Sequence, residues 1–299
     1  MTPVRWILLF VLLLSASPLP AQCANDHRTN KNAGILVSDF TITGTQTISA
    51  TDLDRITSDM IGSCYDENSS EMEQRVRASF QERGYFKVEM KSLTFKPRDP
   101  LGVPKPVTME GDVSEGPQYR LTKITFANNH AVPADELRQQ FPLKAGARME
   151  RAKIASGLDS LRKLYATRGY LDFFSIPATT FGSNATAELS ITVEEGPQYH
   201  MGKLDIVTDR DATAARLRAT WKLAEGDVYD NTYIDDYLST AHDILPANFG
   251  KANIQTLQNC PEAVVNLRLI VDPAQDKSHS EPKNIPCEEK KEEEKKGQN

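Results

Sequence analysis

Histidine and acidic side chains are the groups through which this chain of 299 residues could catalyse a reaction or hold a metal. The five histidines are His27, His130, His200, His242 and His279. They show no metal-ligand spacing. The acidic residues gather at expected helix starts and in Glu-Gly turns, where a capping or solvated role is favoured over a general acid and base pair. The sequence therefore predicts no catalytic residue, no metal site and no cofactor.

Cysteine chemistry is limited to four residues, Cys23, Cys64, Cys260 and Cys287. Four cysteines are too few to form the framework of a disulfide scaffold in a chain of this length. In an oxidising compartment, a disulfide between Cys260 and Cys287 would pin the tail onto the last domain. Unpaired cysteines fit the sequence equally well, so the pairing stays open at this level.

Backbone hydrogen bonding is the chemistry that remains. An exposed edge strand presents N–H and C=O groups that pair with any extended peptide, whatever its side chains. The net charge of −6 argues against nucleic acid as the partner, because nucleic-acid binding needs a basic surface. We therefore expect protein partners.

A duplication sets the domain organisation. The heptads Val113-Ser114-Glu115-Gly116-Pro117-Gln118-Tyr119 and Val193-Glu194-Glu195-Gly196-Pro197-Gln198-Tyr199 lie 80 residues apart and differ at one position. Further landmarks that recur are Leu143 and Gly146 as Leu223 and Gly226, and Gly84-Tyr85 as Gly169-Tyr170. This period is longer than the roughly 20 to 50 residues of solenoid repeats. It predicts three small globular domains in tandem.

The middle unit predicts the order β-α-α-β-β. A strand is expected at 121–126, a short helix opening at Pro133, a longer helix over about 150–168, and strands near 171–180 and 187–194. The longer helix carries one apolar stripe, made of Ile154, Leu158, Leu161 and Tyr165. Gly169 is the expected left-handed cap of that helix.

The flanking units follow the same order with departures. The first has an opening strand at 40–44, a helix at 49–60 and a second helix with the stripe Met72, Val76 and Phe80. Its last hairpin carries a proline-rich insertion at 97–106. The third unit has the stripe Ile234, Leu238, Ala241 and Leu245, with Pro246 expected to end the helix, and a last strand at 264–271.

Such β-α-α-β-β units, with Gly-Tyr after the second helix and a closing Glu-Gly, resemble POTRA (polypeptide-transport-associated) domains. The resemblance covers about 36–272 and implies an α+β fold: three tandem domains, each a three-stranded mixed sheet with two helices on one face. The expected boundaries are 35–118, 119–197 and 198–272. The family resemblance implies the periplasmic region of a BamA-type outer-membrane β-barrel assembly factor, here without the barrel.

The two ends of the chain indicate where it works. Residues 1–24 have the pattern of a secretory signal peptide: Arg5, then an apolar run over 6–14, then small residues. A membrane anchor or a lipidated Cys23 fits this pattern less well. Residues 273–299 are a charged tail, expected to be disordered. We expect an exported protein in the periplasm, associated with the outer membrane through a partner rather than a spanning segment.

The expected binding sites are sheet edges. A right-handed crossover favours the strand order 1-3-2, which leaves the strand after Gly-Tyr at the edge of each sheet. The predicted contact residues on these edges are Phe86, Val88, Met90, Leu171, Phe173, Phe174, Lys251 and Asn253. The resemblance implies an outer-membrane β-barrel protein or unfolded outer-membrane protein clients as partners. The alternative is an envelope or cell-division scaffold that docks one folded partner.

Overall fold

The computed structural model describes residues 35–65, 69–102, 105–272 and 284–285. These residues form two compact units. The first unit comprises the described residues up to Arg120 together with Arg148–Arg151, and the second comprises Leu121–Ala147 and the residues from Ala152 onward. The expected signal peptide and most of the expected tail lie outside the described residues.

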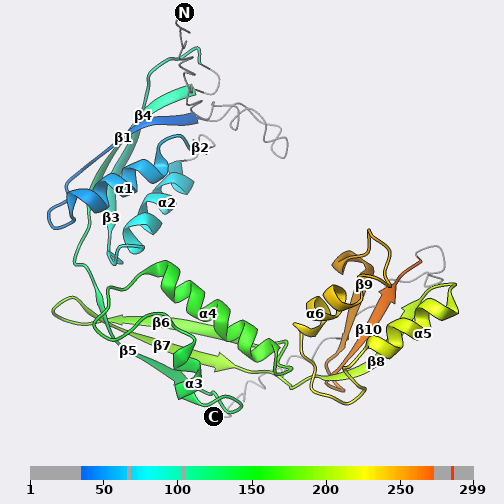
Figure 1. Ribbon diagram of the computed structural model, residues 1–299. Coiled ribbons are helices and arrows are strands. Elements are labelled where there is room, and N and C mark those ends of the chain that lie inside the picture. Colours follow the sequence, from blue (N-terminus) through cyan, green and yellow to red (C-terminus); the bar gives the residue numbers. More distant parts are fainter. Residues whose placement is uncertain (1–34, 66–68, 103–104, 273–283, 286–299) are drawn as a thin grey trace, which may run out of the picture. The chain divides into compact units, whose positions relative to one another are not determined.

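The first unit contains a four-stranded sheet and two helices. Its elements are β1 (Ile35–Thr43), α1 (Ala50–Met60), β2 (Cys64–Tyr65), α2 (Ser69–Gln81), β3 (Glu89–Pro97) and β4 (Lys105–Ser114). The strand order is β2-β1-β4-β3, with β1 parallel to β4 and β3 antiparallel to it. Both helices cover the same face of this sheet (Figure 1). The short β2 is an addition to the three strands that the sequence predicts.

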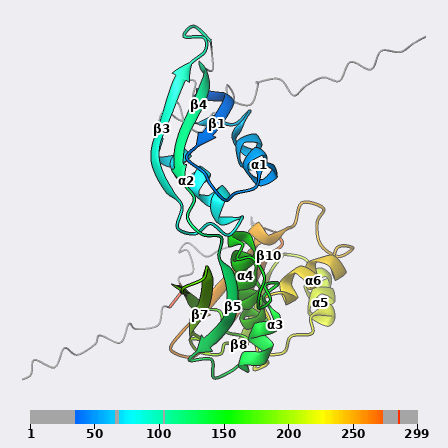
Figure 2. The same ribbon diagram turned by 90° about the vertical axis from the view of Figure 1, so that its left-hand side faces the viewer.

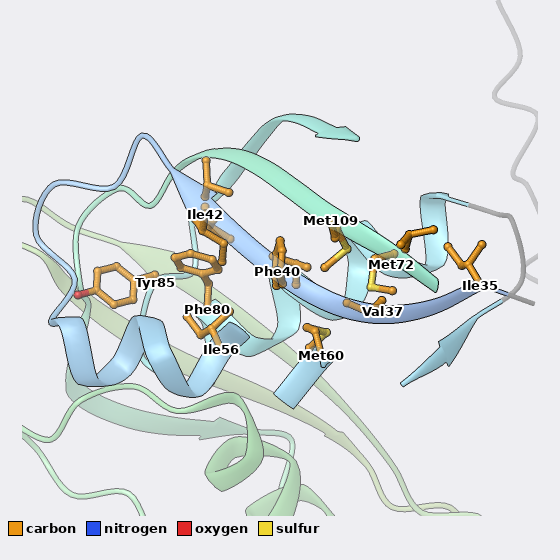
Figure 3. Close-up of a cluster of buried hydrophobic side chains, with 14 residues drawn as sticks. Ile35, Val37, Phe40, Ile42, Ile56, Met60, Met72, Phe80, Tyr85 and Met109 are labelled. Atoms are coloured by element: carbon orange, nitrogen blue, oxygen red, sulfur yellow. The ribbon is translucent and has the colours of Figure 1, made fainter. Parts of the chain in front are cut away.

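A bulge in β1 brings both halves of that strand onto the core. The register against β4 shifts between Val37 and Asp39. A single extra residue reverses the alternation of side chains, so Ile35 and Val37 before the shift and Phe40 and Ile42 after it are all buried. Figure 3 shows these side chains meeting the predicted stripe of α2 between sheet and helices. The stripe is confirmed, because Met72, Val76 and Phe80 are all buried.

The second repeat has the predicted order. Its elements are β5 (Arg120–Ala127), α3 (Ala134–Gln139), α4 (Arg151–Ala166), β6 (Phe174–Phe181) and β7 (Thr186–Glu194). The strand order is β5-β7-β6, with β6 antiparallel to β7. Gly169 has φ +82° after α4, as its expected role as a left-handed cap requires.

The buried face of α4 differs in part from the predicted stripe. Leu161 and Tyr165 are fully buried, but Leu158 is only half-buried. The residue one position earlier, Gly157, faces the core instead, where a Cβ atom would lie 2.2 Å from the ring of Phe141. The ring of Phe141 fills the space that a side chain at position 157 would take, and Leu158 lies partly exposed beside it.

The third repeat completes the second unit. Its elements are β8 (His200–Val207), α5 (Asp211–Thr220), α6 (Tyr233–Thr240), a 3₁₀ turn η2 (Lys251–Asn253), β9 (Ile254–Asn259) and β10 (Val264–Ile270). The strand order is β8-β10-β9, with β8 parallel to β10. The α-helix ends at Thr240 rather than at Pro246 as predicted. Tyr237 fills its buried face and stacks edge-on against Trp221, with ring centroids 4.7 Å apart.

Three sheets of mixed strands with helices therefore confirm the α+β fold and the predicted strand order 1-3-2 in each repeat. Among the described residues, no helix combines the length and the apolar character that crossing a membrane requires.

Candidate functional site

The acidic residue of the first heptad is a structural latch. Glu115 lies at the end of β4 and is 3% exposed. Its carboxylate accepts hydrogen bonds from the backbone N–H of Gln46 at 2.6 Å and of Thr47 at 2.5 Å. The Thr47 hydroxyl also donates to it, at 3.1 Å. These bonds tie the loop after β1 to the end of the strand beside it.

In the other two repeats a carboxylate at the equivalent position also accepts hydrogen bonds from the rest of its repeat. Glu195 accepts from the N–H of Ala131 and from the Tyr165 hydroxyl, each at 2.9 Å. Burial and the Glu195 carboxylate raise the pKa of Tyr165, which keeps the hydroxyl protonated as a donor. In the third repeat the Thr208 hydroxyl donates to Asp272 at 2.6 Å. The carboxylates that end the three sheets therefore cap loops, one of the two roles that the sequence suggests for them.

The Gln-Tyr pair of each heptad has a second structural role. The Gln198 side chain donates to the carbonyl of Arg168 at 3.0 Å, and the Tyr199 N–H donates to the carbonyl of Gly169 at 2.8 Å. In the first copy, Gln118 and Tyr119 make the matching bonds to Arg83 and Gly84, each at 2.9 Å. Each copy of the heptad thus fastens the chain to the Gly-Tyr turn of its own repeat.

The Glu115 latch predicts a dependence of stability on pH. Burial alone would raise the pKa of Glu115, but the hydrogen bonds from Thr47 and Gln46 lower it below its ordinary value. A lowered pKa in the folded state means that the stabilisation is present above the unfolded-state pKa, about 4.3, and is lost as pH falls through the folded-state pKa. Glu115→Gln should lower the free energy of unfolding by about 1 to 2 kcal/mol at pH 7, because a charged acceptor is lost.

The measurement is urea unfolding at pH 7 and pH 3.5, followed by circular dichroism. The difference between wild type and Glu115→Gln should shrink at the lower pH. Glu110→Gln is the control, because Glu110 forms only an exposed ion pair with Lys96 and should change stability by less than about 0.5 kcal/mol. A cost of Glu115→Gln that is the same at both pH values would contradict the latch.

The predicted edge strands are at the edges, but they begin later than expected. β3, β6 and β9 each lie at the end of their sheet. After Gly169 the chain first makes a turn, in which Leu171 N–H donates to the Gly169 carbonyl at 3.1 Å. Phe173 then stacks on Tyr165, with ring centroids 4.2 Å apart, and is buried. Only from Phe174 does the chain run as a strand.

The predicted contact residues are therefore placed unequally. Met90 and Phe174 lie in edge strands, and Phe174 is 58% exposed. Phe86 and Leu171 lie in turns, while Val88 and Phe173 are buried core residues. Lys251 and Asn253 lie in η2, ahead of β9. β3 and β6 begin after the predicted positions because Val88 and Phe173, which follow the Gly-Tyr pairs, are buried in the core.

The ladder between β6 and β7 shows which backbone groups of β6 face outward. The N–H of Gly182 donates to the Thr186 carbonyl at 2.8 Å, which continues the register of this hairpin. Hydrogen-bonded pairs alternate along an antiparallel ladder, so the even-numbered residues of β6 bond to β7. The odd-numbered residues direct their N–H and C=O groups away from the sheet. Ser175 and Thr179 therefore present outward donors, and Pro177 between them has none.

β6 exposes two apolar side chains on the open face of the sheet, where β7 contributes polar ones such as Glu194. Phe174 and Ile176 are 58% and 44% exposed and lie two residues apart on the same face of β6. β6 carries no charged residue along its length. An edge without charged residues lacks one of the features that usually protect a strand from pairing with another chain, although Pro177 removes one outward donor.

The other two edges are less available. β3 lies beside β4 at the edge of its sheet (Figure 2), and two lysines on it form ion pairs with β4, Lys91 with Asp112 and Lys96 with Glu110. Lysine on an edge strand discourages pairing with a further strand. The β9 edge carries residues 284–285 of the same chain, with Ile285 bridged to Asn259 in parallel orientation. β6 is thus the edge best suited to accept a partner strand.

Residues able to perform other chemistry are not gathered in the described ranges. Within them, no group of three or more histidine, cysteine or acidic residues could hold a metal ion. Cys64 and Cys260 both take part in disulfides. Cys23 and Cys287 lie outside the described residues, so the pairing of Cys260 with Cys287 stays a prediction.

The comparison with known families agrees with this geometry. Residues 119–196, which span β5 to β7, match the family model described as "POTRA: Surface antigen variable number repeat". This segment is similar to POTRA domains. The first and third repeats share its strand order and helices, so the chain is a tandem array of POTRA-like folds.

A solved structure shows the same fold. The chain is similar to POTRA domains 3–5 of BamA from Haemophilus influenzae, with a TM-score of 0.55 and 17% identity, over 80% of this chain and 96% of that one. It is also 24% identical over 177 residues to a Treponema pallidum protein named "Putative outer membrane protein assembly factor". That match covers 58% of this chain and 21% of the relative, so the chain spans about a fifth of the relative's length.

Proposed function

We propose that this protein is a non-catalytic periplasmic scaffold that assists outer-membrane protein assembly or polypeptide transport. It binds extended segments of outer-membrane β-barrel proteins, or of their unfolded precursors, by adding their strands to a POTRA sheet. The similarity of residues 119–196 to POTRA domains and the relative named as an assembly factor support the assignment to this process. The protein is exported, and it associates with the outer membrane through such a partner.

The observation that carries the proposal is the β6 edge. Its outward donors at Ser175 and Thr179 lie along a strand with no charged residue. Strands of outer-membrane barrels alternate apolar and polar side chains with a period of two. A strand paired with β6 would place its apolar side chains on the open face beside Phe174 and Ile176, and its polar side chains on the other face. Main-chain bonds would supply affinity for clients of varied sequence.

The experiment removes one outward donor at a time. The probe is a synthetic ten-residue peptide of alternating apolar and polar residues, and its affinity is measured by fluorescence anisotropy. Thr179→Pro and Ser175→Pro should each weaken binding about fivefold, because a hydrogen bond contributes about 1 kcal/mol. Thr179→Val keeps the N–H group and the side-chain shape, and should change the affinity by less than about twofold.

Two results would count against strand addition at β6. One is a proline variant that folds, by its circular dichroism spectrum, and binds the peptide as the wild type does. The other is equal weakening by Thr179→Val and Thr179→Pro. Either result, with binding mapped to the exposed face of α4 around Arg162, would favour a scaffold that docks one folded partner.

A further inference from the structure

The edge of the third repeat already holds an extended segment of this chain. The Ile285 N–H donates to the Gln258 carbonyl at 2.8 Å, and the Cys260 N–H donates to the Ile285 carbonyl at 2.9 Å. The two bonds flank Asn259, as in a parallel ladder. The side chain of Asn284 also accepts from the Gln258 N–H, at 3.1 Å. Residues 284–285 thus use the outward groups of Gln258 and Cys260.

This contact depends on backbone rather than side-chain burial. Ile285 is 50% exposed and Asn284 is exposed, so little apolar surface is removed from water. Two of the three bonds join main-chain groups, and the third uses an amide oxygen in place of a carbonyl. A segment of different sequence could form the same main-chain bonds. The β9 edge is therefore able to accept an extended peptide in parallel orientation, with residues 284–285 as its resident occupant.

A covalent link lies beside this occupant. Cys260 donates its N–H to Ile285, is 8% exposed and takes part in a disulfide. Cys287 follows Ile285 by two residues in the sequence. A disulfide between these two cysteines would hold the segment beside the edge in addition to the chain itself. Such a short connection raises the effective concentration of the segment at the edge to the millimolar range or above. A free peptide that binds weakly would then fail to displace it.

We propose that residues 284–285 are an internal strand that blocks the partner-accepting edge of the third repeat, held by a disulfide between Cys260 and Cys287. The partner-accepting role of this edge rests on the proposed function, whereas the internal strand and its disulfide do not. In the resting protein the edge of β6 accepts a client and the edge of β9 does not. Release of the segment adds a second acceptor edge.

The disulfide is tested by digestion with trypsin under non-reducing conditions and mass spectrometry. The peptide of residues 252–268, which contains Cys260, should appear linked to the peptide of residues 284–290, which contains Cys287. Reduction should separate them. Linkage of Cys260 to any other cysteine would overturn the proposed tether.

The internal strand is tested by amide hydrogen exchange in the full chain. The variant Asn284→Ala/Ile285→Pro/Cys287→Ser removes the side-chain acceptor, the Ile285 donor and the tether. It should speed exchange at the Cys260 amide at least tenfold, while Ile285→Val should leave the rate unchanged. Should the triple variant not fold, Asn284→Ala with Cys287→Ser serves instead. Equal exchange at Cys260 in wild type and variant would overturn the proposal.

Occupancy of the edge is tested with a free copy of the segment. The probe is a synthetic peptide of residues 281–289 with serine at the cysteine position. It should shift the amide signals of Gln258 and Cys260 in the triple variant and leave those of the wild type unchanged. Shifts of equal size in the wild type, or none in the triple variant, would overturn the block. Neither result bears on binding at β6, so the block at β9 can be refuted without refuting client binding at β6.

Discussion

Gly169→Ala is expected to lower the free energy of unfolding by about 3 kcal/mol or more. Gly169 has φ +82°, a conformation that costs alanine about 1 to 2 kcal/mol. In addition, an added Cβ would lie 2.6 Å from the Tyr199 carbonyl oxygen and 3.1 Å from Val228 Cγ1. The backbone of Tyr199 is itself bonded to Gly169, so it cannot move away without breaking that bond.

Gly146→Ala is the matched control. Gly146 has φ +81°, nearly the same conformation, but no heavy atom lies within 4 Å of an added Cβ. It should therefore cost only the backbone strain, about 1 to 2 kcal/mol. Urea unfolding followed by circular dichroism measures both variants. Equal costs would mean that the close approach of Tyr199 to the Gly-Tyr turn contributes nothing.

The second large effect is expected in α4. Leu161→Ala should lower the free energy of unfolding by about 3 to 5 kcal/mol, because the side chain is fully buried and its removal leaves a cavity. The neighbouring Arg162 is exposed, and Arg162→Ala should cost less than about 0.5 kcal/mol. Leu158, which is half-buried, should give an intermediate value on substitution by alanine. Urea unfolding measures the three variants. A larger loss in the free energy of unfolding for Leu158→Ala than for Leu161→Ala would mean that the buried face of the helix is misassigned.

The sequence predicts the repeats and their order well because local signals agree at each landmark. Gly169 marks the end of α4, because glycine readily adopts the left-handed backbone conformation found there. Leu161 and Tyr165 mark the apolar face of the helix. The crossover rule then orders the strands, and the observed order agrees. The duplicated heptad also identifies the acidic residues at Glu115 and Glu195 as a shared feature, although the loops that they cap become apparent only in the fold.

The starts of the edge strands were less predictable. Leu171, Phe173 and Phe174 follow Gly-Tyr in one strand-prone run of the sequence, yet Phe173 is drawn into the core by its stack on Tyr165. That contact is tertiary, so no local pattern reveals it. The direction of the Phe174 N–H follows from the ladder to β7, which shows that Ser175 and Thr179 carry the outward donors instead.

The occupant of the β9 edge could not be found from the sequence. Residues 284–285 lie in a polar, charged stretch that has too few apolar residues to predict a strand. Their pairing with Gln258 and Cys260 joins segments about 25 residues apart through backbone groups, which every residue possesses. The cysteines were the only hint, and they suggest a tether rather than a strand.

Amide hydrogen exchange at β6 tests whether a peptide strand adds to this edge. The rates at Ser175 and Thr179 are measured in the wild type with and without the alternating ten-residue peptide at saturating concentration. We expect at least tenfold slower exchange at both amides in the complex, with no change at Ile176, whose N–H already bonds to β7. Binding of the peptide that leaves the exchange of Ser175 and Thr179 unchanged would contradict strand addition at this edge.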